Sequence, residues 1–147
     1  MTDTLLSKST EEEILLSKSN WWKTACLNAV LRGGTNFTAP QTVYIALYTS
    51  NPTDADTGQE VSGGGYERRV VTFGAPVIAD RRATTSSTTD VYFPIATADW
   101  GLVTHIGIRT AATGGNLLYH GAVTNPRTVQ TNDSLRFMAG RINIDEG

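Results

Sequence analysis

The sequence predicts a mainly β fold, an antiparallel two-sheet β-sandwich of about eight strands with an N-terminal helix and an extended arm. Short runs of β-branched and aromatic residues, such as 43–48, suit half-buried strands. Turn-forming residues interrupt these runs roughly every 8–12 residues beyond Thr42. Threonine, which favours strands and turns over helices, occurs 22 times among 147 residues, mostly beyond Gly33. We therefore expect an arm at 1–19, a helix at 20–33 and a β-sandwich domain at 40–147.

Length and charge limit the classes of function. A chain of 147 residues has room for one domain with its own core plus an appendage. The net charge of −2 gives no electrostatic basis for binding nucleic acid or an anionic membrane. Cys26 is the only cysteine, so no intramolecular disulfide forms. No apolar run is long enough to span a membrane and no signal peptide is evident, which favours synthesis in a cytoplasm.

The arm at 1–19 contains a near-repeat, Leu5–Ser9 and Leu15–Ser19. Thr10 followed by three glutamates has the pattern of a helix start, so a short helix is expected from about Glu11. A frayed terminus is the alternative. The arm is too apolar for a purely solvated tail, and we expect it to dock on another subunit through five side chains, Leu5, Leu6, Ile14, Leu15 and Leu16. Deletion of 1–19 is then expected to leave the domain folded.

The helix at 20–33 begins after Ser19 or Asn20 as N-cap and stops at Gly33-Gly34. One face, formed by Trp22, Cys26, Ala29 and Val30, is expected to cover the sheet. The adjacent Trp21 and Trp22 cannot point the same way along a helix. One of the two is therefore available to the arm or to a neighbouring chain.

A long polar segment separates the first strand, 43–48, from the second, 66–73. It contains Asn-Pro, several aspartates and Gly63-Gly64-Gly65, which permit positive φ or close backbone approach. A loop of this length is usually functional or packed on a partner. The later strands are expected at 90–95, 102–108, 116–123, 128–129, 135–139 and 142–144, with a tight turn before the hairpin strand 116–123. The Ser/Thr-rich run at 83–89, which follows 74–82, is either an exposed strand or a loop.

Candidate chemical sites in the sequence are incomplete. His105 and His120 face each other across the expected hairpin, but no cysteine or regularly spaced acid accompanies them as a metal ligand. Asp99 and His105 lack a serine presented on a nucleophile turn. The acids of the polar loop only superficially resemble a calcium loop. We therefore expect no catalytic, cofactor-binding or metal-binding residue, no cofactor and no enzymatic activity.

Trp100 lies between Asp99 and Gly101 at a strand entry, where we expect a buried indole with a bonded N–H. If it were exposed instead, Tyr48, Trp100 and the Asp-rich loop would form an aromatic and polar platform for a host glycan. These two interpretations make opposite predictions about the burial of Trp100.

Several motifs, in order, resemble a family of tailed-phage virion proteins. They are Tyr44–Gly58, Glu60–Tyr66 with Arg68, Phe93-Pro94, Ala96–Gly101, Val103–Ile108, Gly114–Tyr119 and Asp133–Phe137 with Ala139-Gly140. The resemblance covers about 22–144. The family is commonly labelled tail fibre, and some related proteins resemble capsid decoration or cement proteins. This chain departs from the usual pattern in its extra twenty or so N-terminal residues and in Asp80-Arg81-Arg82.

The resemblance implies a non-enzymatic structural protein of the virion, made in the host cytoplasm, whose partners are the major capsid protein or tail proteins. The additional arm favours capsid decoration, and a tail fibre or tail-tip component, with host-glycan binding as a further option, is the alternative. Arg68, Arg69, Arg81 and Arg82 are expected to reach acids of a neighbouring copy, since only arginine follows Lys23 among the basic residues. Compositional drift is the alternative explanation. We expect weak, salt-sensitive self-association in solution, with Trp21 or Trp22 also at an interface, and a trimer on the particle.

Overall fold

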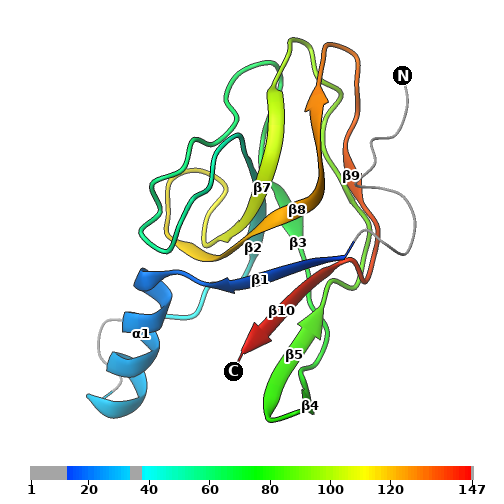
Figure 1. The fold of residues 1–147 in the computed structure, drawn as a ribbon. Coiled ribbons are helices and arrows are strands. Elements are labelled where there is room, and N and C mark those ends of the chain that lie inside the picture. Colours follow the sequence, from blue (N-terminus) through cyan, green and yellow to red (C-terminus); the bar gives the residue numbers. More distant parts are fainter. Residues whose placement is uncertain (1–12, 34–37, 147) are drawn as a thin grey trace.

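The computed structural model describes residues 13–33 and 38–146. Eight strands form one curled sheet (Figure 1), in the order β3 (Arg69–Val71), β2 (Val43–Tyr48), β7 (Gly101–Arg109), β8 (Leu117–Val129), β1 (Ile14–Lys18), β10 (Ile142–Glu146), β5 (Arg82–Ser86) and β4 (Val77–Ala79). A second sheet pairs β6 (Val91–Tyr92) with β9 (Arg136–Phe137). The mainly β prediction is confirmed, while the two-sheet sandwich stays a prediction. Over the described residues, no helix has the length and apolar character needed to cross a membrane.

Strand β1 joins two halves of the large sheet. Its first residues, Ile14 to Leu16, pair in parallel with β10, and Ser17 and Lys18 pair antiparallel with β8. Ile14 and Leu16 are 1% and 0% exposed, whereas Leu15 between them is 58% exposed. This alternation is the two-residue period of a strand with one buried face. The parallel pair also makes the sheet mixed rather than purely antiparallel.

The prediction of a short helix through Ile14, Leu15 and Leu16 is therefore wrong, and these residues are not a separate arm. A helix of one or two turns is unfavourable in free energy because of its nucleation step, unless packing stabilises it. In the strand, Ile14 and Leu16 enter the core while backbone groups pair on both sides. The expected docking of Ile14 and Leu16 on another subunit is replaced by burial within this chain. Leu5 and Leu6 lie outside the described residues.

Helix α1 (Asn20–Leu31) follows β1 directly. The Ser19 side chain accepts from the Trp22 N–H at 3.1 Å and donates to the Leu117 carbonyl, so the predicted N-cap is confirmed. Gly33 at φ +85° follows the helix end, as a left-handed C-terminal stop requires. The helix projects from the body of the molecule (Figure 1).

The core lies against the inner faces of the long strands. Its buried side chains come from strands and loops along the sequence, but not from α1, β4 or β5, and include Leu16, Ile45, Leu47, Ile106, Val129, Leu135, Phe137 and Ile142. Phe93 and Tyr66 stack at 6.2 Å between ring centroids, and Tyr66 meets Trp100 edge-on at 5.5 Å. This aromatic cluster attaches the polar loop before β3 to the core.

Candidate interaction surfaces

Arg68 anchors the polar loop to the turn between β7 and β8. Its Nε and NH2 donate to the two carboxylate oxygens of Glu60, both at 2.8 Å. Its NH1 donates to the carbonyls of Ala111 and Gly114 at 2.8 and 2.9 Å. Burial opposes ionisation of Glu60, but hydrogen bonds from Arg68 and Tyr66 outweigh it and lower the pKa of Glu60. The pair is bidentate. Tyr66 holds the Glu60 carboxylate, and the two backbone carbonyls hold the Arg68 guanidinium.

Arg109, the last residue of β7, makes a second bidentate pair, with Asp56 of the polar loop. NH1 and NH2 donate to the Asp56 carboxylate at 2.8 and 3.0 Å, and NH1 also donates to the Tyr48 hydroxyl at 2.9 Å. Among the described residues, Arg109 is the one charged residue that is buried. The sequence alone does not mark Arg109, because its partner Asp56 becomes visible only when the polar loop folds over the end of β7.

These pairs explain the acids that superficially resemble a calcium loop. Asp56 and Glu60 each hold a guanidinium where a calcium ion would need free carboxylate oxygens. The prediction that Arg68 reaches acids of a neighbouring copy is wrong, because Arg68 pairs with Glu60 of its own chain. Charge here stabilises the loop rather than an interface.

The glycan platform predicted at Tyr48 and Trp100 is wrong. Tyr48 is 1% exposed and Trp100 is 5% exposed, so neither ring offers a face to a ligand. The Trp100 indole N–H donates to the Gly64 carbonyl at 2.8 Å, which confirms the prediction of a buried, bonded indole.

Asp54 connects α1 to the sheet. Its carboxylate meets the His120 ring at 2.7 Å and the Lys23 ammonium at 2.8 Å, and its carbonyl accepts from the Asn20 N–H at 2.8 Å. Hydrogen bonds from Lys23 and His120 lower the pKa of Asp54. Burial, and then the proximity of His120, lower the pKa of His105. Among the described residues, no three His, Cys, Asp or Glu side chains gather as a metal site would require.

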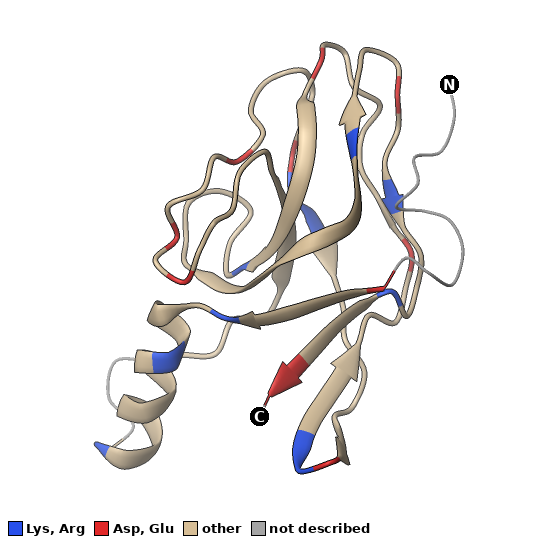
Figure 2. Cartoon of the chain, in the orientation of Figure 1, with Lys and Arg blue, Asp and Glu red and all other residues tan. Residues whose placement is uncertain are grey.

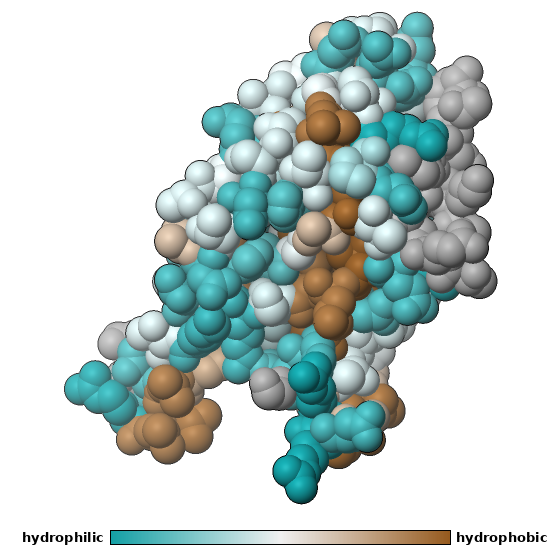
Figure 3. Space-filling model, in the orientation of Figure 1, coloured by the Kyte–Doolittle hydropathy of each residue, from teal (hydrophilic) through white to brown (hydrophobic). Residues whose placement is uncertain are grey.

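Most of the surface of α1 is exposed. None of its twelve residues is buried, although eight of them are apolar. Trp22, whose indole N–H donates to the Tyr119 hydroxyl at 2.9 Å, fixes the inner face against β8. Val30, which was expected on that covered face, is 77% exposed, and Leu27 and Leu31 are 61% and 73% exposed. We call Leu27, Val30 and Leu31 the α1 face, and Figure 3 shows the apolar atoms gathered at this end of the molecule.

The other predicted interface residues lie apart from one another. Leu15 is exposed on β1, and Trp21 stacks beside Trp22 with 6.5 Å between ring centroids. Arg69 pairs with Glu67 at 2.7 Å, and Arg82 pairs with Asp145. Arg81 lies in the turn between β4 and β5, where Figure 2 shows acidic and basic residues side by side. The structure does not bring the arginines together as one contact surface.

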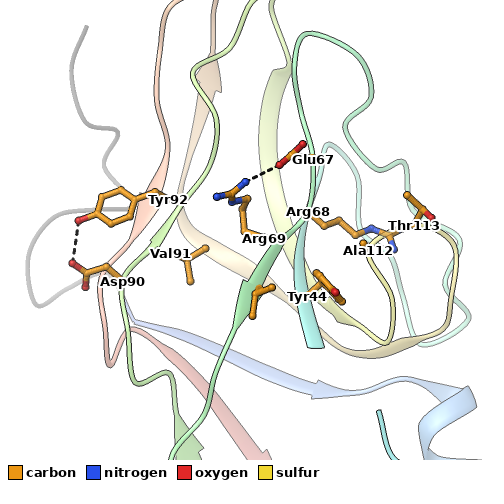
Figure 4. Close-up of a pocket in the computed structure, with 10 residues that line it drawn as sticks. Tyr44, Glu67, Arg68, Arg69, Asp90, Val91, Tyr92, Ala112 and Thr113 are labelled. Atoms are coloured by element: carbon orange, nitrogen blue, oxygen red, sulfur yellow. Dashed lines mark hydrogen bonds and ion pairs between the residues drawn. The ribbon is translucent and has the colours of Figure 1, made fainter. Parts of the chain in front are cut away.

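An open groove of about 610 Å³ lies between β3, the last strand of the large sheet, and β6, an edge of the small sheet. In Figure 4, Tyr92 and Asp90 stand on one side and Tyr44, Ala112 and Thr113 on the other, with Arg69 and Val91 between them. The segments beside β3 and β6 pair at Phe73 and Ser87 and then separate, which opens the groove. No sequence signal marked this site, because its walls come from strands far apart in the chain.

Comparison with known protein families identifies the family of this chain. The model of a family described as podophage GP4 fiber I protein gp80 matches residues 17–145. A search of curated proteins finds no significant match. The match begins within β1 and ends within β10, so it spans nearly the whole of the described domain. The chain therefore belongs to the podophage fiber I protein family and is a structural component of a phage virion.

Proposed function

We propose that this protein is a non-catalytic tail-fibre component, made in the host cytoplasm and assembled into the fibre through the α1 face. The family description supports the fibre assignment. The α1 face is the observation on which the mode of assembly rests, because an apolar helix with no buried residue gains little by folding alone.

Capsid decoration is the second candidate, since a projecting apolar helix also suits attachment to a shell. The sequence argument for decoration depends on a long docking arm. Ile14 and Leu16 fill the core, so that argument now rests only on residues that precede β1. The fibre assignment is therefore the stronger of the two.

A second copy of the chain is the partner that fits the α1 face. Leu27, Val30 and Leu31 place no charge within the face, so two such faces meet without opposing like charges. Within α1 the charged residue is Lys23, which is held by Asp54, and Arg32 follows the face directly at the C-cap. Two α1 helices related by a two-fold axis would bury the same side chains in both copies.

The face is small, which sets the strength of the contact. Three exposed side chains fall well below the roughly 800 Å² per partner of a stable interface. We therefore expect weak self-association in solution, with a dissociation constant above about 10 µM. Because the contact is apolar, added salt should leave it unchanged or strengthen it, unlike the salt-sensitive arginine pairing predicted from the sequence.

Localisation and copy number in the virion test the assignment. Immunogold labelling at the tail, with a copy number far below that of the major capsid protein, is expected for a fibre. Labelling spread over the head, with a copy number near that of the capsid protein, would establish decoration instead.

Assembly is tested with the triple variant Leu27→Ser, Val30→Ser, Leu31→Ser. It should remain folded, lose self-association in sedimentation velocity and fail to enter virions. Leu102→Ser, which changes an exposed leucine on β7, is the matched control and should assemble normally. Normal self-association of the triple variant would refute the role of the α1 face.

A further inference from the structure

Strand β4 is the last strand of the large sheet, and its outer edge is open. Among the described residues, β5 is its neighbour in the sheet. Residues 75–80 are all exposed, and Val77 and Ile78 are 60% and 78% exposed. The hairpin of β4 and β5 lies in a part of the molecule separate from α1 (Figure 1). An open edge can pair with another chain, and proteins commonly protect such edges with charged residues, which β4 lacks.

The turn between β4 and β5 fixes which backbone groups face the open edge. Its two central residues, Asp80 and Arg81, have φ +50° and +68°, as a type I′ turn requires. Such a turn joins the two residues that flank it by a hydrogen bond, and the first of these is Ala79. Hydrogen-bonded and non-hydrogen-bonded pairs alternate along an antiparallel ladder. The next pair, Ile78 with Ala83, is therefore not hydrogen-bonded, and the N–H and C=O of Ile78 point toward the open edge.

The pairing on the other side of β5 agrees with this orientation. The Ser87 N–H donates to the Ile142 C=O at 2.9 Å, and the register with β10 continues without a break back to Ala83. Alternate residues of a strand direct their backbone groups to the same side. Ala83 therefore faces β10, as Ser87 does, and leaves Ile78 without a partner in β5.

We propose that β4 pairs with β4 of a second copy, antiparallel and about a two-fold axis at Ile78. In this register the Ile78 N–H of each copy donates to the Ile78 C=O of the other, so both open backbone groups are used. The two exposed Ile78 side chains then meet on one face of the joined sheet. Val77 of each copy lies opposite Ala79 of the other, and the two eight-stranded sheets become continuous.

The residues on either side of β4 favour this register. Pro76 has no N–H, so a register that places Pro76 opposite Ile78 loses one of the two donors. Antiparallel pairing about Ile78 places the charged turn of each copy, Asp80-Arg81, beside Ala75 and Pro76 of the other. Like charges therefore do not meet. Pro76 also limits the contact to a short stretch, so we expect it to be weaker than the contact between two α1 faces.

Pairing at β4 also supplies what the α1 contact lacks. A two-fold contact uses the same face in both copies and therefore stops at a dimer. A second two-fold contact, at β4, gives each chain two neighbours, and the two contacts in alternation build a linear array. This role in an array rests on the proposed α1 contact, whereas the pairing of β4 strands depends neither on that contact nor on the fibre assignment.

Cysteine trapping tests the register. In a Cys26→Ser background, Ile78→Cys should form a disulfide-linked dimer under mild oxidation, because the two paired Cα atoms lie about 5.5 Å apart, within the range of a disulfide. Val77→Cys is the matched control, since its two Cα atoms would lie roughly 8 Å apart. We expect at least about tenfold more dimer from Ile78→Cys than from Val77→Cys. Equal yields from the two variants would overturn the proposal.

Sedimentation velocity of the oxidised Ile78→Cys protein tests the array. Cross-linked dimers should associate further, and should remain dimers when the α1 triple variant Leu27→Ser, Val30→Ser, Leu31→Ser is added. Cross-linked dimers that never associate further would support the β4 pair and refute the α1 contact, so the two proposals fail separately.

A charge at the open edge tests the pair in the particle. Ile78→Lys should keep the melting temperature of the parent, because Ile78 is exposed, and its incorporation into virions should fall at least about tenfold. Val70→Lys, at an exposed valine of β3, is the matched control and should be incorporated normally. Normal incorporation of Ile78→Lys would overturn the role of β4 in assembly.

Discussion

Gly64 and Trp100 are fitted to each other: the Gly64 carbonyl accepts from the indole N–H at 2.8 Å, and a Cβ on Gly64 would lie 2.9 Å from the indole ring. The same Cβ would meet the Ala98 carbonyl oxygen at 2.8 Å. Gly64 also has φ +59°, which L side chains rarely adopt. Gly64 therefore lets the backbone of the polar loop reach the edge of a buried aromatic ring.

Gly64→Ala should lower the free energy of unfolding by about 2–4 kcal/mol, because left-handed strain adds to overpacking. Gly63→Ala is the matched control. Gly63 has φ +75° but nothing within 4 Å of its Cβ position, so only the strain of about 1 kcal/mol should remain. Urea denaturation of both variants measures the difference. Equal losses in the two would show that the indole contact has no energetic consequence.

Trp100→Ala should lower the free energy of unfolding by about 3–5 kcal/mol. The buried indole contacts Tyr66, so its removal leaves a cavity. It also removes one of the two hydrogen bonds to the Gly64 carbonyl, which still accepts from the Thr97 N–H at 2.9 Å. Thermal melting of the variant against the parent tests this. An unchanged melting temperature would contradict the burial of the ring.

Leu16→Ala should cost about 2–5 kcal/mol, whereas Leu15→Ala should change the free energy of unfolding by less than about 0.5 kcal/mol. The two leucines are adjacent, and only Leu16 enters the core. Deletion of 1–19 removes all of β1 and should abolish cooperative unfolding, contrary to the expectation from the sequence. Equal, small effects of the two substitutions would restore the view of this segment as a docking arm.

Glu60 makes stability depend on pH in the acid range. Its pKa is lowered in the folded chain, since the bonds from Arg68 and Tyr66 outweigh the effect of burial, and it is near 4.3 when unfolded. The unfolded chain binds the proton first as pH falls, so the contribution is complete above the unfolded pKa and is lost through the folded pKa. Glu60→Gln should therefore destabilise most near neutral pH, with a penalty that shrinks as the pH falls below the unfolded pKa.

Urea titrations of the parent and the Glu60→Gln variant across this range measure that penalty. Glu67→Gln is the control, because Glu67 lies on the surface in an exposed pair with Arg69. Its effect should be small at every pH. A penalty for Glu60→Gln that is the same at acid and neutral pH would exclude the pKa effect.

The sequence predicted those features that depend on local chemistry. Ser19 as N-cap and Gly33 as helix stop follow from backbone geometry, and the burial of Trp100 follows from its turn. The strand at Ile14–Lys18 was missed because three consecutive apolar residues fit a helix or a strand equally well. Only the presence of unpaired edges on β8 and β10 decides between them.

Contacts between distant segments could not be predicted. Asp56 and Arg109 are 53 positions apart, and nothing in either flank indicates that they form a pair. Tyr92 and Tyr44 line the same groove only because β6 diverges from β3 beyond the Phe73–Ser87 bridge. Conversely, Tyr48 is an aromatic residue of the kind that forms surface platforms. It is buried here, and Arg109, which pairs with Asp56, donates to its hydroxyl.

The position of β1 also has a mechanical consequence. The helix leaves from the end of β1, so tension on α1 is transmitted along a strand that is flanked on both sides. Hydrogen bonds to β8 and β10 run across the direction of that pull and are loaded together in shear, rather than one at a time as at a peeling sheet edge. Attached by its helix, the domain would resist being drawn away from its anchor through a strand whose hydrogen bonds are loaded in shear.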